Sequence, residues 1–473
     1  MVLKLFKFTL KTAPAFGKYL KKHGINGKKI KKIADYKTLP VMDKQNYLRA
    51  FEFKDLFPYR DLSRVTTISA TSGTTGSPLY FPRGEEQDAQ YEYVAELYLR
   101  NQFQIHQKKT LGLIGFGLGI WIGGMFTYKN FNKIAAKGYP FSLIPVGANV
   151  ELYLQAFKKF APLYDQIILM GYPPFVKDVI DEGKDHGIDW KSYKLRILTA
   201  AEGFSEKFRE YLAEKAGIKN PYNDIINMYG TVEMGTMAHE TGLANLIRKI
   251  AVNDHKIFRT IFPHANRTPT LAQYHPDIVY FEEEKGEVIA TGYGSSIPLF
   301  RYRFPDIGGV VPFETMVTKL KTAGVDIFAE AKKAGIAETI MRLPFVYVYE
   351  RSDHAIIVRG ANIYPEEIKN ALHHKELESV VTGKFTMIKK EDRKMNEYFE
   401  VNVELKRNAK EREDLNKTIR DAVVENLVKT NNEYKYLYSL DSERVAPSII
   451  LWPYQHEKYF KPGGKQKWSV KIN

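Results

Sequence analysis

Short apolar runs alternate with longer amphipathic segments between residues 111 and 201. The apolar runs span residues 111–115, 143–146, 167–170 and 195–199. Apolar residues recur at helical spacing in 150–160 and 174–182. This alternation predicts right-handed βαβ units and a largely parallel sheet. Ligands of such sheets bind at the carboxyl ends of the strands, so we expect a ligand site at that edge.

The pattern is different before and after this region. Residues 1 to about 60 are predicted to form helices and connectors, with Asp43 as a helix N-cap, and residues 85–104 have helical spacing. Later runs predict antiparallel strands that end before Asp306, at residues 277–281, 287–291 and 299–302. Residues 313–333 are predicted to be helical.

The composition changes again near Asp353. Beyond it, the pattern predicts a small α+β unit with strands at 355–358, 400–405 and 449–451 and helices at 365–373 and 411–430. We therefore predict an α/β protein of two domains, residues 1–352 and residues 353–473. A length of 473 residues agrees with this division, because it exceeds what one hydrophobic core usually serves.

Charge and cysteine content limit the classes of function. The chain has no cysteine, which excludes disulfides, thiolate metal sites and cysteine nucleophiles. Its formal net charge is +15, from 70 basic and 55 acidic residues. We expect this excess to be spread along the chain as a solvated surface that favours anionic small molecules, and we expect no nucleic-acid partner.

One uncharged run, Thr110–Tyr128, is just long enough to span a bilayer at nineteen residues. Six of these residues are glycine, so we expect buried strand and loop and no transmembrane segment. The first seven residues alternate lysine with apolar residues and lack the continuous core of a signal peptide. We expect a cytoplasmic protein.

A loop rich in glycine and hydroxyl groups follows a strand-like run that starts at Thr67. From Thr71 to Ser77 it has five hydroxyl side chains and two glycines. Hydroxyl donors and glycine backbone N–H groups that can approach closely suit a polyphosphate. The loop is not of the Walker type, because no Gly-Lys-Ser/Thr follows the glycines. The order Ser-Gly-Thr-Thr-Gly-x-Pro resembles the phosphate-binding loop of the adenylate-forming superfamily.

Four further segments resemble the phenylacetate-CoA ligase branch of that superfamily, which includes capsule-biosynthesis and deazaflavin-cofactor adenylyltransferase relatives. They are residues 39–44, residues 115–124, the sequence Arg-Tyr-Arg-Phe-Pro-Asp at 301–306, and residues 351–368. The resemblance implies a large domain of mainly parallel sheets, flanking helices and a β-barrel-like part, followed by a small mobile C-terminal domain. It also implies ATP and Mg²⁺ as cofactors, and CoA as acceptor.

The resemblance assigns roles to residues of the large domain. The phosphate loop would be formed by Ser72, Gly73, Thr74, Thr75 and Gly76. Glu202 and Gly203 would line the adenine pocket, and Tyr229, followed by Gly230 and Thr231, would stack on adenine. Asp306 would accept both ribose hydroxyls. Glu233 would hold Mg²⁺, for which a carboxylate oxygen is a suitable ligand.

Further roles fall at the domain boundary and beyond it. Arg351 and Gly360 would contact the nucleotide, and Asp353 would be the hinge of the small domain. Lys465 would be the catalytic lysine that bridges the attacking carboxylate and the α-phosphate. Compensating that negative charge needs a mobile cation, which a lysine on a glycine-rich loop supplies.

The sequence departs from the family pattern at a few positions. Val232 stands where a hydroxyl usually precedes the Mg²⁺ carboxylate, with Thr231 shifted by one place. Phe304-Pro305, Glu350 and His354 are the other departures. None removes a charge that the chemistry requires.

These observations predict an enzyme that activates a carboxylic acid, aryl or arylacetic by resemblance, with ATP and transfers it to the thiol of CoA. The glycine- and aromatic-rich segment 115–125, with residues 172–174, is expected to line the acyl pocket. Three alternatives stay open: another acyl acceptor such as an amine, hydroxyl or carrier protein, an adenylyltransferase, or a nucleotide-binding protein without turnover. The expected partners are a small carboxylate, ATP and CoA, with a homodimer as a further expectation.

Overall fold

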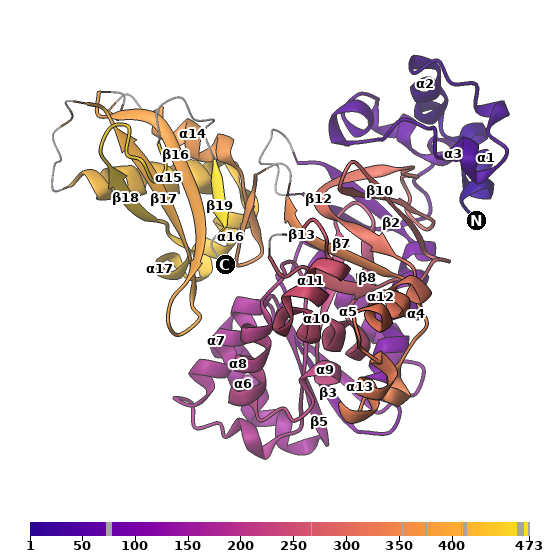
Figure 1. Cartoon of the computed structure of the whole chain (residues 1–473), viewed down its shortest axis with the longest axis horizontal. Helices are drawn as coiled ribbons and strands as arrows, with labels where there is room; N and C mark the ends of the chain where they lie inside the picture. Colours follow the sequence, from indigo (N-terminus) through magenta and orange to yellow (C-terminus); the bar gives the residue numbers. More distant parts are fainter. Residues whose placement is uncertain are drawn as a thin grey trace. The chain divides into compact units, whose positions relative to one another are not determined.

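The structure is a computed structural model of the chain (Figure 1). It describes residues 1–71, 78–265, 267–351, 354–373, 376–377, 379–407, 409, 414–460 and 468–471. The chain divides into two compact units. Unit 1 comprises Met1–Ala70 and Tyr80–Glu350, and unit 2 comprises Thr71–Leu79 and Arg351–Asn473. The functional domains 1–352 and 353–473 stay predictions.

A long mixed sheet is the centre of unit 1. Among the described residues it has eleven strands, in the order β10 (Val279–Glu284), β11 (Glu287–Gly292), β12 (Tyr302–Val311), β13 (Phe345–Arg351), β9 (Thr270–Gln273), β8 (Gly235–His239), β7 (Ile225–Thr231), β6 (Leu195–Thr199), β5 (Gln166–Gly171), β3 (Thr110–Ile114) and β4 (Phe141–Pro145). A separate hairpin pairs β1 (Val65–Ala70) with β2 (Tyr80–Gly84) in antiparallel fashion.

The helices of unit 1 are mostly short. They are α1 (Val2–Thr12), α2 (Pro14–Lys22), α3 (Ile33–Tyr36), α4 (Glu85–Asn101), α5 (Ile122–Ala135), α6 (Val150–Phe160), α7 (Pro173–Gly183), α8 (Glu206–Ala216), α9 (Pro221–Asp224), α10 (Gly242–Asn253), α11 (His255–Ile261), α12 (Phe313–Thr322) and α13 (Ile327–Lys333). Asp43 caps the helical turn Lys44–Leu48 as predicted, because its carboxylate accepts from the backbone N–H groups of Gln45 and Asn46.

The parallel half of the sheet, β4-β3-β5-β6-β7, confirms the predicted βαβ units. Every residue of β3, β5 and β6 is buried, as expected for strands covered by helices on both faces. Ile168 and Met170 of β5 pack in a core with α4 and α5. Ile167 and Leu169 alternate with them and point to the opposite face, where α7 contacts the strand.

The other half, from β7 through β8, β9, β13, β12 and β11 to β10, is antiparallel in its recorded pairs. In a flat sheet β7 and β12 would lie on the order of 19 Å apart, because neighbouring strands are about 4.8 Å apart. Yet the Tyr229 hydroxyl of β7 hydrogen-bonds the Asp306 carboxylate of β12 at 2.8 Å. This half is therefore strongly curled, as the barrel-like part of the predicted fold requires.

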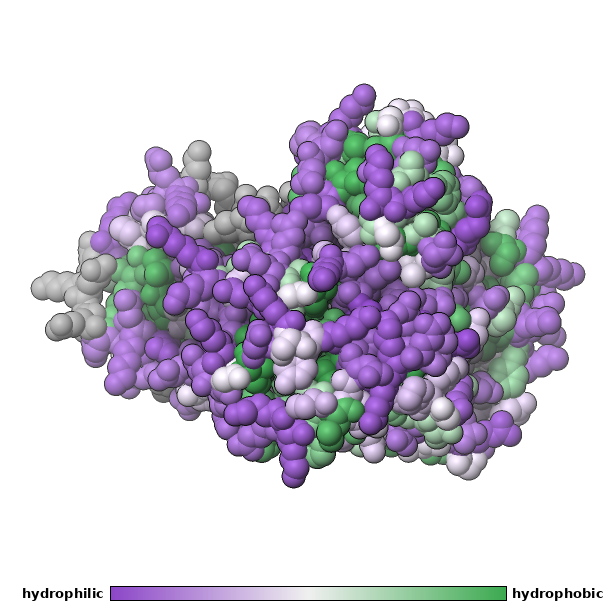
Figure 2. Space-filling model, turned by 90° about the horizontal axis from the view of Figure 1, so that it is seen from below, coloured by the Kyte–Doolittle hydropathy of each residue, from purple (hydrophilic) through white to green (hydrophobic). Residues whose placement is uncertain are grey.

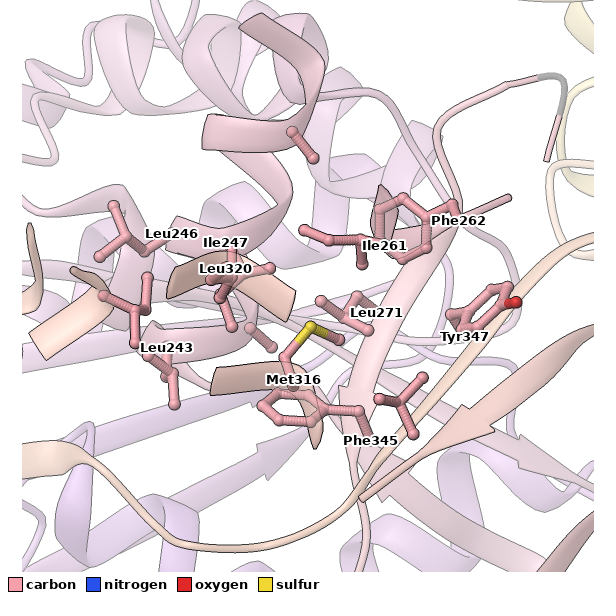
Figure 3. Close-up of a cluster of buried hydrophobic side chains, with 14 of the residues drawn as sticks. Leu243, Leu246, Ile247, Ile261, Phe262, Leu271, Met316, Leu320, Phe345 and Tyr347 are labelled. Atoms are coloured by element: carbon pink, nitrogen blue, oxygen red, sulfur yellow. The ribbon is translucent and has the colours of Figure 1, made fainter. Parts of the chain in front are cut away.

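Helices α10, α11 and α12 cover β9 and β13 through one apolar core. Figure 3 shows its members converging, with Leu243 and Ile247 from α10, Met316 and Leu320 from α12, and Phe345 from β13. All five are 2% exposed or less. This core supports the curled half of the sheet from outside.

Unit 2 is a small α+β structure, as predicted. Its four-stranded sheet has the order β18 (Ser448–Trp452), β17 (Glu397–Leu405), β16 (Val381–Glu391) and β19 (Ser469–Lys471), beside a hairpin of β14 (Ile356–Val358) and β15 (Ala361–Ile363). The helices are α14 (Pro365–Leu372), α15 (Leu415–Thr430), α16 (Asn432–Leu440) and α17 (Ser442–Val445).

Three local predictions need correction. The second part of the run Thr110–Tyr128 is not strand or loop, because α5 begins at Ile122. Asp306 does not follow a strand but lies inside β12. Residues 313–333 form two helices, α12 and α13, because the turn at Gly324 has φ +89°.

No helix within the described residues is long and apolar enough to cross a membrane. The face of the molecule in Figure 2 is covered mostly by hydrophilic side chains, and hydrophobic ones show in separate patches. Scattered apolar residues of this kind are normal on a protein surface.

Candidate active site

The glycine loop is closed at its base by two hydrogen bonds. The Thr71 N–H donates to the Leu79 carbonyl at 3.0 Å, and the Leu79 N–H donates to the Thr71 hydroxyl at 3.0 Å. The flanking strands β1 and β2 pair from Ala70 and Tyr80 outward, which confirms the predicted position of the loop between two strands. Ser72, Gly73, Thr74, Thr75 and Gly76 lie outside the described residues.

Tyr229 and Asp306 meet where the curled half of the sheet returns to β7. The Tyr229 hydroxyl donates to Asp306 Oδ2 at 2.8 Å. The Tyr229 ring is tilted by only 23° from the Phe281 ring, with 6.3 Å between the centroids. Both Tyr229 and Asp306 are half-buried. An aromatic face next to a carboxylate is a suitable arrangement for a nucleoside, whose base stacks and whose sugar donates hydrogen bonds.

Glu233 lies in the turn between β7 and β8 and is 7% exposed. Lys44 Nζ approaches its Oε1 at 3.1 Å, and the Tyr302 hydroxyl lies 3.5 Å from the same oxygen. Burial opposes ionisation, but the Lys44 ammonium and the hydrogen bonds hold the pKa of Glu233 below its usual value. The carboxylate is therefore ionised near neutral pH, as a ligand for a cation must be.

The turn that carries Glu233 is held at several points. Gly230 has no room for a side chain, since a Cβ there would lie 2.4 Å from the Gly235 carbonyl. Thr231 Oγ1 accepts from the Met234 N–H at 3.3 Å, and Gln87 donates to the Met234 carbonyl at 2.8 Å. Gly230 and Thr231 thus have structural roles here, and nucleotide contact stays a prediction for them.

Arg83 explains how the turn holds its shape with valine at position 232. Its guanidinium donates to the Val232 carbonyl and lies 5.0 Å above the Phe126 ring. Arg83 is 1% exposed, and burial lowers its pKa to about 10, so it stays charged at neutral pH. The turn is fixed through its backbone, which needs no particular side chain at 232.

Lys44 was not among the site residues predicted from the sequence. It follows a segment that docks on β12, where Met42 N–H donates to the Arg301 carbonyl at 3.2 Å and Arg303 N–H donates to the Met42 carbonyl at 2.8 Å. The Arg301 side chain also donates to the Leu39 carbonyl. The family motif at 39–44 includes Lys44 and could have marked it as a site residue. The sequence of this motif does not reveal, however, that its last residue lies beside Glu233.

The Glu202–Gly203 segment follows β6, at the carboxyl edge where a ligand was predicted. Asn227 of β7 donates from Nδ2 to the Glu202 carbonyl at 3.0 Å. Ala201 has φ +79°, a strained conformation for a residue with a side chain. A Cβ at Gly203 would lie 2.5 Å from Thr270 Oγ1, so a larger residue here would have to displace the Thr270 side chain.

A buried cluster of four charges supports this segment from below. Arg209 contacts Glu206 at 3.1 Å and Glu240 at 2.9 Å, while Arg248 contacts Glu206 at 3.2 Å and Glu240 at 2.8 Å. All four are 4% exposed or less. Arg248 also donates to the Phe204 carbonyl, so the cluster fixes the residue that follows Gly203.

The remaining predicted residues are partly described. Arg351 is the last residue of β13. Gly360 has φ +93° and Arg359 φ +51°, and they form the two-residue turn between β14 and β15, so glycine has a structural reason there. Asp353 and Lys465 lie outside the described residues.

No group of three His, Asp or Glu residues in the described ranges could hold a metal ion alone. Glu233 would be the single protein carboxylate, which is sufficient when phosphates supply other ligands. The segments 115–125 and 172–174 stay predicted as the acyl pocket. A separate small cavity beside the Glu233 turn is lined by residues that include Gln87, Tyr91, Phe126, Met234 and Gly292.

Comparison with known proteins followed from this geometry. No family model matches the chain. A phenylacetate-coenzyme A ligase of Escherichia coli (strain K12) is 22% identical over 373 residues, which cover 77% of this chain and 74% of that protein. A phenylacetate-coenzyme A ligase of Pseudomonas putida is 22% identical over 325 residues, 67% of this chain and 63% of that protein.

Solved structures agree with the fold. A 2-hydroxyisobutyryl-CoA ligase in complex with 2-HIB-AMP and CoA superposes with a TM-score of 0.66 at 15% identity, covering 99% of this chain and 88% of that chain. The same ligase in its postadenylation state gives a TM-score of 0.54. The two curated relatives confirm the resemblance to phenylacetate-CoA ligases, and the solved structures confirm the predicted fold class.

Proposed function

We propose that this chain is an AMP-forming acid–CoA ligase. In the first half-reaction a carboxylate oxygen of the acid attacks the α-phosphorus of ATP, the bond between the α-phosphorus and the bridging oxygen breaks, and pyrophosphate leaves. In the second, the sulfur of CoA attacks the acyl carbon, the bond from that carbon to the AMP oxygen breaks, and the thiol proton passes to solvent. The relatives are named for phenylacetate and 2-hydroxyisobutyrate, so carboxylic acids are the substrate class.

The observation that carries this proposal is the hydrogen bond from Tyr229 to Asp306, with Glu233 four residues after Tyr229 in the turn that follows β7. Asp306 would accept the two ribose hydroxyls and Tyr229 would present its ring to adenine. Glu202 and Gly203, held by Asn227 and the buried charge cluster, would form the wall of the base pocket. These donors and acceptors are fixed before the nucleotide arrives, so little reorganisation energy is lost on binding.

Glu233 fits a magnesium site. This proposal is supported by the burial of the carboxylate, by its lowered pKa and by the lysine ammonium beside it, which indicate surroundings that favour positive charge. Bound Mg²⁺ would neutralise charge on the phosphates. In this chain Lys44 and Tyr302 orient the carboxylate, and Arg83 and Gln87 hold its turn.

The direct test is an acid-dependent pyrophosphate-release assay with ATP and Mg²⁺. It should include phenylacetate, substituted aryl acids and 2-hydroxyisobutyrate, followed by addition of CoA and detection of the thioester. Glu233→Gln should lower pyrophosphate release roughly 100-fold, because it removes a preorganised charge contact. Glu283→Gln, an exposed carboxylate of β10, is the matched control and should leave the rate unchanged.

Two outcomes would contradict the proposal. If no acid in the panel releases pyrophosphate while ATP still binds, the chain is a nucleotide-binding protein without turnover. If pyrophosphate is released but no thioester forms with CoA, the acceptor is another nucleophile. A third result, equal rates for Glu233→Gln and wild type, would remove Glu233 from the site while leaving the reaction in place.

Lys465, which resemblance assigns to adenylate formation, has its own prediction. Lys465→Ala should retain ATP binding and form acyl-adenylate about two to three decades more slowly, a cost of about 3 to 4 kcal/mol. Thioester formation from a synthetic acyl-adenylate should be spared, because that step brings no second anion to the phosphate. Pyrophosphate release at the wild-type rate would show that Lys465 is surface charge.

A further inference from the structure

Much of the net positive charge of the chain comes from its first 34 residues. This segment has ten lysines, at positions 4, 7, 11, 18, 21, 22, 28, 29, 31 and 32, and no aspartate or glutamate. The net charge of the whole chain is only +15. The expectation of evenly spread charge is therefore wrong, and two-thirds of the excess belongs to less than a tenth of the chain.

The segment folds as helices that are fixed on one side only. Phe6 of α1 and Phe16 of α2 pack edge to face at 5.3 Å, and Phe16 stacks on Phe300 at 4.7 Å. All three are 1% exposed or less. Since the aromatic side holds the helices to the rest of unit 1, at the end marked N in Figure 1, the lysines are left on the outside.

The outer side of α1 is a stripe of exposed residues. Lys4, Lys7, Phe8 and Lys11 are all exposed and have the spacing i, i+3, i+4, i+7 of one helix face. Phe8 is 45% exposed, which is unusual for a phenylalanine within a group of lysines. The stripe thus combines positive charge with an apolar side chain in the manner of surface-binding amphipathic helices.

A second aromatic residue extends this stripe. Tyr59 is 72% exposed, and its ring lies 6.1 Å from that of Phe8. Its φ of +58° and that of Arg60, +57°, are strained for residues with side chains. Asp55, an acidic residue of the segment that leads to Tyr59, is paired with Lys18 at 2.7 Å and Arg60 at 2.8 Å.

We propose that this surface, defined by α1, α2 and Tyr59, docks the protein on a bilayer that contains anionic phospholipids. Lysines attract the anionic headgroups, and each one near such a surface contributes roughly fivefold to binding. Tyr59 would enter the interfacial layer, where an aromatic ring with a polar tip is favoured, and Phe8 would bury its apolar ring beside it. This is peripheral binding and needs no spanning helix. The inference is independent of the proposed catalytic function.

A membrane fits this surface better than a nucleic acid does. All ten cations of the segment are lysines, which act as point charges, whereas groove and phosphate recognition favours the planar fork of arginine. The two exposed aromatics contact each other edge to face, so they do not form an open stacking platform for bases.

The test is sedimentation with vesicles. Wild type should bind vesicles of phosphatidylcholine with about one third phosphatidylglycerol, should not bind pure phosphatidylcholine, and should be released by high salt. Lys4→Glu, Lys7→Glu and Lys11→Glu combined should weaken binding at least about 100-fold. The matched control, Lys321→Glu, Lys332→Glu and Lys333→Glu on α12 and α13, changes net charge equally and should weaken binding by less than about threefold.

The aromatic contribution needs a separate pair of variants. Phe8→Ser with Tyr59→Ser should weaken binding about tenfold or more without a change in charge, whereas Leu163→Ser, which alters a side chain that is 60% exposed, should not. The α1 lysine variant and its α12 and α13 control should both keep the ATP-binding affinity and the thermal midpoint of wild type. This result would show that both variants are folded.

Three results would overturn the proposal. Wild type that stays in solution with anionic vesicles at low salt would do so directly. Equal losses in the α1 and control lysine variants would mean that only net charge matters. If duplex DNA or RNA binds wild type more tightly than the vesicles, and the aromatic variant binds like wild type, the surface is a nucleic-acid site.

Discussion

The two halves of the long sheet differ in what they do. In the parallel half, every residue of β3, β5 and β6 is buried, and the polar residues in these three strands are Thr110, Gln166, Arg196 and Thr199. The curled antiparallel half has charged side chains that pair across it, with Arg301 beside Glu282 and Glu284 and with Asp306 beside Tyr229. A flat buried sheet gives rigidity, whereas a curled sheet lets side chains from distant strands meet. Substitutions in the parallel half should therefore lower stability, whereas substitutions in the curled half should lower ligand binding.

The largest effect is expected at the junction of the halves, in the buried charge cluster. Arg209→Met removes one cation from between Glu206 and Glu240 and leaves Arg248 to compensate two buried carboxylates. The free energy of unfolding should fall by about 3 to 5 kcal/mol. Denaturant-induced unfolding followed by fluorescence would measure this change. ATP affinity should fall as well, because the cluster holds Phe204 and the segment before it.

Lys215→Met is the control for that variant, since Lys215 is an exposed residue of the same helix α8. Its effect on stability should stay within about 0.5 kcal/mol. If Arg209→Met costs less than about 1 kcal/mol, the cluster does not hold the junction and the two halves are joined by apolar packing alone.

In the parallel half, truncation of a core side chain should lower stability and leave ATP binding unchanged. Leu169 of β5 is 0% exposed, and Leu169→Ala should lower the free energy of unfolding by about 2 to 5 kcal/mol. The ATP dissociation constant, measured calorimetrically below the unfolding transition, should remain that of wild type. A variant that binds ATP much more weakly while folded would show that the parallel half also shapes the site.

Acid sensitivity should belong to the curled half. His239 of β8 is 0% exposed, and burial lowers its pKa to about 4. The unfolded chain, with an ordinary histidine pKa near 6.5, binds this proton first as the pH falls. The stability that neutral His239 contributes is therefore complete above about pH 6.5 and is lost toward pH 4, a change of about 2 to 3 kcal/mol.

His239→Gln should flatten that part of the stability profile. Urea titrations from pH 7 to pH 4 would measure it, with His186→Gln in the parallel half as control. His186 is partly exposed and lies 3.5 Å from Glu151, so its replacement tests whether the effect is specific to the buried histidine. The same slope in wild type and His239→Gln would assign the acid sensitivity to other groups.

The smallest effect in free energy is expected at Asp306, and it should appear in binding and not in stability. Asp306→Ala leaves both ribose hydroxyls without an acceptor and should weaken ATP binding by about 1 to 3 kcal/mol. The thermal midpoint should change little, since Asp306 is half-buried. Asp277→Ala, at an exposed position before β10, is the control. Unchanged ATP affinity in Asp306→Ala would mean that the meeting of Tyr229 and Asp306 is structural.

Prediction from the sequence was more successful in the parallel half. The helix at 150–160 and the strand at 195–199 have the predicted bounds, because periodicity is a local property and these elements follow it. The strands β8, β9 and β13 of the curled half were not predicted. They are short or mix polar with apolar residues, and what defines them as strands is pairing with partners far away in the sequence.

The sequence predicted which residues belong to the candidate site, but it did not predict how their side chains contact one another. The motif resemblance gave Tyr229, Glu233 and Asp306 by number, but nothing in the spacing from 229 to 306 indicates a hydrogen bond between their side chains. Lys44 and Arg83 were missed, because a lysine in a linker and an arginine after a loop have no pattern of their own.

The sequence by itself determined the alternation of strands and helices, the place of the glycine loop between two strands, and the glycines that turns and close contacts require. These depend on local backbone preference and on which side of each element is apolar. The tertiary structure decided that the sheet curls, that Asp306 reaches Tyr229, that Lys44 keeps Glu233 ionised, and that Phe8 and Tyr59 stand together among lysines. Such contacts join residues tens to hundreds of positions apart, and only the packing of the whole core fixes their distances.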